Sequence, residues 1–156
     1  MDFNHPIPPT CPQCGAPWKP DLTCQDHFHQ MLFWEAEEAA LGKVHHLMVL
    51  SYSLQHPSLY SSQGLENAIG LLVDFLEKGM EPDQVRFEMR AVVDAGKRSW
   101  TITARSASQG TYPNPVHWPM TVADIVAGGP ETYCQNVRTW AHSILKTLKE
   151  SGNLTE

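Results

Sequence analysis

The chain has 156 residues, of which 42% are hydrophobic, so it is long enough to fold as one domain, residues 1–156, without disulfides. Its net charge of -6 disfavours nucleic acid as a partner, because phosphate binding relies on basic surfaces. The sequence contains neither the ~20-residue apolar run of a membrane span nor a signal-peptide pattern. We therefore expect a cytoplasmic protein that does not bind membranes.

The first segment, residues 1–22, contains six of the twelve prolines. Proline disrupts helices, so this segment is expected to form turns and extended chain. It also holds two of the four cysteines, and a third follows at Cys24. In a reducing compartment, cysteines grouped in this way favour metal binding over disulfides. We therefore predict an N-terminal metal-binding arm that, with the start of the first helix, occupies residues 1–30.

The remainder, residues 31–156, is predicted to be a helical body. Apolar residues recur at helical spacing, Thr23 and Thr121 are suitable N-caps, and glycines or prolines follow the helical segments. The clearest stripe precedes Gly79 and consists of Leu65, Ile69, Leu72 and Leu76. The five main predicted helices cover residues 23–41, 43–55, 62–78, 82–95 and 130–151, and a short helix is predicted at residues 121–127.

One long stretch, residues 97–120, interrupts the helical pattern with serine, threonine, glycine and proline. It is predicted to be a loop, with a possible short strand at residues 100–103. Loops of this length in a compact domain are usually functional. The fold class is therefore all-α, a bundle of about five helices with a zinc-knuckle arm and one long loop.

Cys11 and Cys14 are two residues apart and precede Gly15, as in a zinc knuckle. Two thiolates at this spacing can bind one ion, and glycine permits the positive φ of the tight turn. The alternative is that these two cysteines are free thiols or a redox pair, with Cys24 buried in a helix. A redox pair normally begins a helix after a strand, and the prolines here disfavour that setting.

The second half of the predicted site lies at the start of the first helix. Cys24 and His27 are one turn apart and differ by ~60° around the axis, so both can reach one ion. We therefore predict zinc bound by Cys11, Cys14, Cys24 and His27, in a closed, structural site. The alternatives for the fourth ligand are His29, His45 and His46.

The second predicted helix carries polar groups on one face. His45, Tyr52 and His56 lie within ~20° of one line along the helix. With Gln55, they are candidate binding residues in a cleft, and Gln55 and His56 are positioned to reach a ligand or the zinc arm. The alternative is that they are structural groups with backbone partners. The acidic residues Glu35, Glu37 and Glu38 are expected to form a solvated face, and Cys134 to be a small core residue.

Three segments together resemble a family of uncharacterised bacterial proteins, a domain of unknown function. They are Cys-Pro-x-Cys-Gly at residues 11–15, His45 followed by Tyr52-x-x-Gln55-His56-Pro57, and Thr121-Val-Ala-Asp-Ile with the final helix around Trp140. The resemblance implies that the knuckle and the Gln-His-Pro segment belong to one pattern and meet in space. It implies no reaction.

Taken together, these patterns favour a zinc-binding interaction or regulatory module over an enzyme, with a protein or a small ligand as its partner. The alternative is a small metal- or histidine-dependent hydrolase or transferase. Its pocket would lie around His45, Tyr52 and His56.

Overall fold

A computed structural model describes residues 8–79 and 109–154 of the chain. In these residues all regular structure is helical, apart from isolated β-bridges, which confirms the predicted all-α class. The predicted helix at residues 82–95 and the possible strand at residues 100–103 lie outside the described ranges. The described helices are α1 (Cys24–Glu37), η1 (Ala39–Val44), α2 (His45–Leu54), η2 (Pro57–Leu59), α3 (Ser62–Glu77), α5 (Val122–Ala127) and α6 (Tyr133–Glu150).

Several helix ends follow from the local signals in the sequence. Thr23 caps α1 and Thr121 caps α5, each in a capping box with an aspartate three residues later. Gly79 and Gly152 follow α3 and α6 with positive φ. The predicted first helix differs at its end: the backbone is extended at Glu38, so α1 stops there and the 3-10 helix η1 leads into α2.

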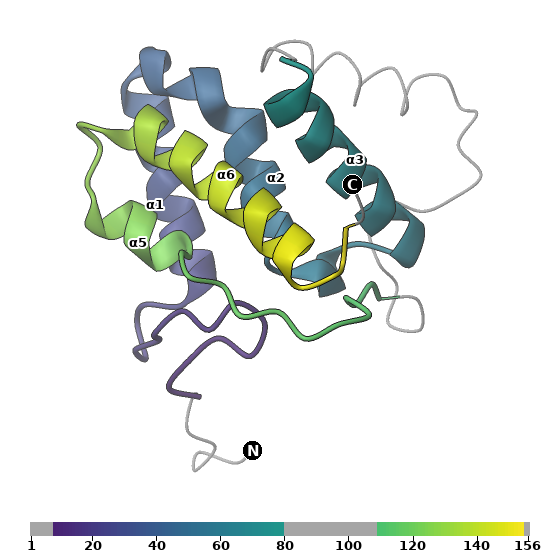
Figure 1. The fold of residues 1–156 in the computed structure, drawn as a ribbon. Coiled ribbons are helices and arrows are strands. Elements are labelled where there is room, and N and C mark those ends of the chain that lie inside the picture. Colours follow the sequence, from purple (N-terminus) through teal and green to yellow (C-terminus); the bar gives the residue numbers. More distant parts are fainter. Residues whose placement is uncertain (1–7, 80–108, 155–156) are drawn as a thin grey trace.

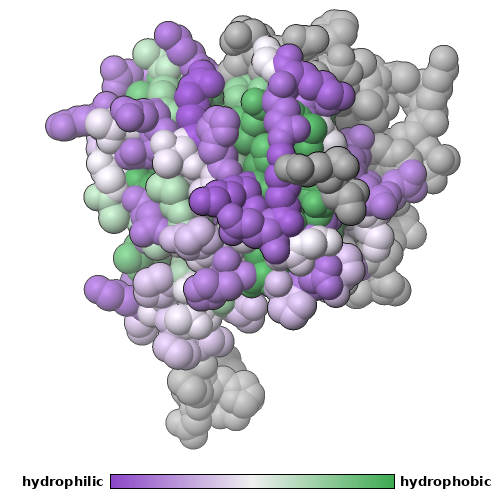
Figure 2. Space-filling model, viewed as in Figure 1, coloured by the Kyte–Doolittle hydropathy of each residue, from purple (hydrophilic) through white to green (hydrophobic). Residues whose placement is uncertain are grey.

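The core forms around α6, which packs against α2, α3 and α5 (Figure 1). One side of α6 is fully buried, because its large apolar residues repeat every three or four positions. In Figure 2, which has the same viewpoint, hydrophilic side chains predominate and hydrophobic ones show between them. The fully buried residues on this side of α6 are Tyr133, Val137, Trp140, Ile144 and Leu148.

The segment from Gln109 to Thr121 runs along one end of the bundle in an irregular conformation (Figure 1). It is attached to the end of α2, because Tyr112 donates to the Leu54 carbonyl at 2.5 Å and Gln55 donates to the Met120 carbonyl at 2.7 Å. This segment therefore fixes the chain around residues 54–57, where α2 ends. None of the described helices is long and apolar enough to cross a membrane.

Candidate metal centre

The arm forms a tight turn around Cys11. The backbone N–H groups of Gln13 and Cys14 both donate to Cys11 Sγ at 3.4 Å. Gly15 has a φ of 81° and donates to the Cys11 carbonyl at 2.9 Å. These bonds orient the sulfurs of Cys11 and Cys14 toward the same side of the turn, as two metal ligands require.

Cys24 enters the site from the first position of α1. The capping box between Thr23 and Asp26 fixes that position, because it holds the first turn of the helix in place. The indole N–H of Trp18 donates to Cys24 Sγ at 3.1 Å. A thiolate is favoured at this position, since the N-terminus of a helix attracts negative charge.

His56 enters from the other side, immediately after α2. The backbone of His56 leaves the helical region, with a φ of -126°, because Pro57 follows it. The His56 Nδ1–H donates to the Tyr52 carbonyl at 2.7 Å, and the His56 ring stacks on the ring of Tyr52. The other ring nitrogen, Nε2, is buried and has no hydrogen-bond partner. This is the arrangement of a metal-binding histidine, whose second nitrogen is held by a neighbouring acceptor.

The donor atoms of Cys11, Cys14, Cys24 and His56 all lie within 4.8 Å of one another. All four residues are buried, with exposed fractions of 2–5%. Cys14 Sγ and Cys24 Sγ are 3.5 Å apart. Three sulfurs and one imidazole nitrogen are the donor set of a tetrahedral soft-metal site, so these residues can hold a metal ion.

The close approach of these four side chains shifts the pKa values of Cys11, Cys14 and His56. The Cys14 thiol lowers the pKa of Cys11 well below its usual range, and the Cys11 sulfur raises the pKa of Cys14. Burial on its own lowers the pKa of His56, but the adjacent Cys11 and Cys24 sulfurs and the Tyr52 carbonyl raise it to about 9. A metal ion bound here would take the place of the thiol protons and of any proton on His56 Nε2.

A model of a family of unknown function (DUF5946) matches residues 9–149. The chain belongs to this family. The predicted resemblance to an uncharacterised family is thereby confirmed, and the match spans the DUF5946 chain from the arm to the last turns of α6. No curated protein and no solved structure matches the chain.

The fourth residue of this group in the DUF5946 chain is His56 and not His27, the residue that the sequence pattern favoured. His27 is buried on α1, where burial lowers its pKa. The helical spacing showed that His27 could reach an ion beside Cys24, but it could not show that the end of α2 lies closer. The hint was the placement of His56 at a helix end, within reach of the arm.

The other histidines considered as ligands lie elsewhere. His29 is exposed on α1 and lines a cleft beside the cysteines. His45 is bonded to Glu35, and the His46 ring lies edge-on to the ring of His45. None of these three is in the four-residue group.

The predicted binding residues are divided between different places. Tyr52 and His56 are stacked and line the cleft. Gln55 is fully buried, and its amide bonds to the Met120 carbonyl. His45 lies at the opposite end of α2. Of the four residues, Tyr52 and His56 line the described cleft, and Gln55 and His45 do not.

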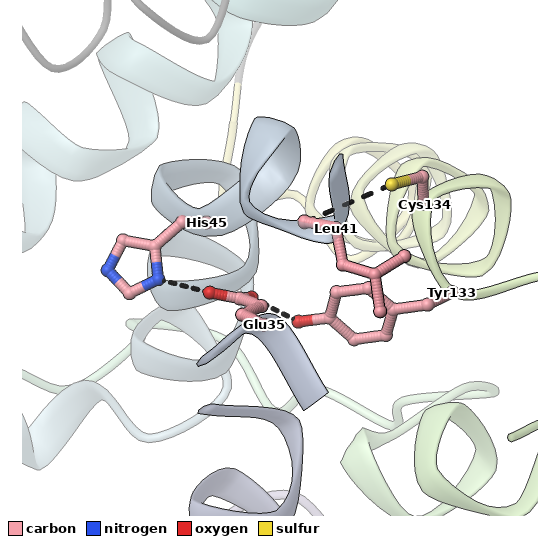
Figure 3. A network of polar contacts seen from close by, with 5 residues as sticks. All are labelled: Glu35, Leu41, His45, Tyr133 and Cys134. Atoms are coloured by element: carbon pink, nitrogen blue, oxygen red, sulfur yellow. Dashed lines mark hydrogen bonds and ion pairs between the residues drawn. The ribbon is translucent and has the colours of Figure 1, made fainter. Parts of the chain in front are cut away.

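Glu35 joins three helices (Figure 3). Its carboxylate accepts from His45 Nδ1–H at 2.6 Å and from the Tyr133 hydroxyl. The Glu35 side chain is 8% exposed, so the prediction that it belongs to a solvated face is wrong, although Glu37 and Glu38 are exposed. No local sequence pattern indicates this network, because Tyr133 lies 98 residues further along the chain.

Beside the cysteines the surface opens into a cleft of about 630 Å³. Three of the four donor residues line it: Cys11, Cys24 and His56. The remaining walls come from the arm, the first two turns of α1 and the end of α2. Cys134, the remaining cysteine, lies apart on α6, where it is partly buried against the core.

Proposed function

We propose that Cys11, Cys14, Cys24 and His56 bind one zinc ion, and that the protein is a zinc-binding interaction or regulatory module in which the metal is structural. The observation that carries this proposal is the buried group of four donor atoms within 4.8 Å. Three thiolates and one imidazole favour zinc over harder ions such as magnesium.

The structural role of the ion follows from the number and origin of its ligands. Four protein donors complete a tetrahedral shell and leave no position for a water molecule. They come from the arm, the start of α1 and the end of α2. The arm contributes few apolar side chains to the core, so the ion would replace a hydrophobic contact as the attachment between the arm and the helices. The partner would be a protein or a small ligand that recognises this assembled surface.

Elemental analysis of the purified protein tests the zinc site. We expect one zinc per chain in the wild type and loss of zinc in Cys11→Ser, Cys24→Ser and His56→Gln. His27→Gln and Cys134→Ser are matched controls that should retain the ion, and circular dichroism would establish that each variant is folded. Retention of zinc by His56→Gln together with its loss from His27→Gln would overturn the ligand set.

The cleft favours a second candidate, a small metal- or histidine-dependent hydrolase or transferase. Cys11, Cys24 and His56 line it, so a substrate in the cleft would lie beside the metal. Catalysis by the ion would need an open coordination position. Cobalt substitution distinguishes the two candidates: added azide should leave the visible spectrum of a closed site unchanged and alter that of an open one.

A further inference from the structure

The cleft beside the metal centre has aromatic walls. Trp18, Phe28 and Tyr52 line it, and all three are half-buried. The Tyr52 ring contacts the Phe28 ring at a centroid distance of 4.7 Å and the His56 ring at 4.3 Å. Trp18 is held against the centre by its N–H bond to Cys24 Sγ. The aromatic surface therefore directly adjoins the metal ligands.

With zinc bound, the charge beside the cleft would be negative. None of the described residues that line it is a lysine, an arginine, an aspartate or a glutamate. Zinc with three thiolates and a neutral imidazole carries a net charge of about -1. The chain as a whole also carries a charge of -6. An anion in the cleft would be repelled, whereas a cation would be attracted by the centre and by the rings of Trp18 and Phe28.

We infer that this cleft binds a small quaternary ammonium compound, with its methylated cationic group against Trp18 and Phe28 and beside the zinc–thiolate centre. The inference rests on the proposed zinc site, which supplies the negative charge. A cleft of about 630 Å³ is within the usual size range for small-molecule sites.

The absence of a carboxylate among these lining residues favours a methylated cation over a primary ammonium group. A primary ammonium has three N–H donors and needs strong acceptors when it leaves water. A quaternary ammonium has no N–H donor, so aromatic faces and a diffuse negative charge are sufficient. The ligand class is therefore choline-like.

Calorimetric titration of the zinc-loaded full chain tests the inference, with choline and its neutral isostere, in which a tert-butyl group replaces the trimethylammonium group. The two ligands have nearly the same shape and differ in charge. We expect choline to bind roughly tenfold more tightly than the isostere, from the cation–π and charge contributions. Equal affinities, or no choline binding by protein that contains one zinc per chain, would overturn the inference.

Phe28→Leu keeps an apolar side chain in the cleft and removes the aromatic face. It should retain zinc and weaken choline binding about tenfold. Phe33→Leu is the matched control, because Phe33 is 56% exposed on the same helix and does not line the cleft. Equal affinity of the two variants for choline contradicts the proposed site. Protein purified without zinc would overturn the proposed function and this inference together, whereas zinc-loaded protein that does not discriminate would overturn only this inference.

Discussion

Helices α1 and α2 lie close together at both ends, with different chemistry at each. At one end Cys24, the first residue of α1, lies beside His56, just after α2. At the other end Glu35 in the last turn of α1 bonds to His45, the first residue of α2 (Figure 3). The two helices therefore run in opposite directions, and each junction uses a histidine at one end of α2.

The two junctions differ in whether their groups satisfy one another. The Glu35 carboxylate accepts hydrogen bonds, and His45 and Tyr133 donate them, so the network is complete. At the other end His56 Nε2 is buried without a partner beside three sulfurs. Thiols are weak hydrogen-bonding groups. The carboxylate junction is therefore complete without a ligand, whereas the cysteine junction is where we propose that an ion binds.

The largest effect should come from removing the metal. A tightly bound ligand at about a thousand times its dissociation constant stabilises a protein by ~4 kcal/mol, so a strong chelator should lower stability by at least that amount. Denaturant unfolding with and without the chelator measures the change. Amide hydrogen exchange should increase around Cys11, Cys24 and His56 and remain low around Glu35. An unchanged unfolding midpoint would show that the cysteine junction is complete without an ion.

Breaking the carboxylate junction should have a smaller effect. Glu35→Ala leaves the buried Tyr133 hydroxyl without its acceptor, which should cost about 1–3 kcal/mol in the free energy of unfolding. Zinc content should stay the same, because Glu35 is not in the four-residue group. The control is Glu37→Ala on the same helix, where the side chain is exposed. Equal unfolding free energies for the two variants would argue against the network.

The smallest effect is expected from His45→Gln. The His45 side chain is 37% exposed, so its pairing with Glu35 is partly screened by solvent and should contribute no more than about 1 kcal/mol. The same substitution at His56 should abolish zinc binding and destabilise the protein far more. The comparison is made by urea unfolding of both variants. Similar losses would mean that His56 contributes only hydrogen bonding.

The sequence predicted the features that depend on neighbouring residues. The caps at Thr23 and Thr121, the glycine ends of α3 and α6, and the apolar faces of those helices all follow from spacings of a few residues. The same holds for the turn around Cys11 and Cys14, which depends on Gly15 and on local N–H bonds to sulfur. These features were predictable because local geometry determines them.

Only the tertiary structure decided which histidine joins the cysteines and what Glu35 does. His27 and His56 are both chemically suitable ligands, and the choice depends on where the end of α2 lies relative to the start of α1. Glu35 is adjacent to exposed acidic residues in sequence, but helix packing buries it against Tyr133. Residue types and spacings determine helices and turns, whereas contacts between distant segments depend on how the helices pack around α6.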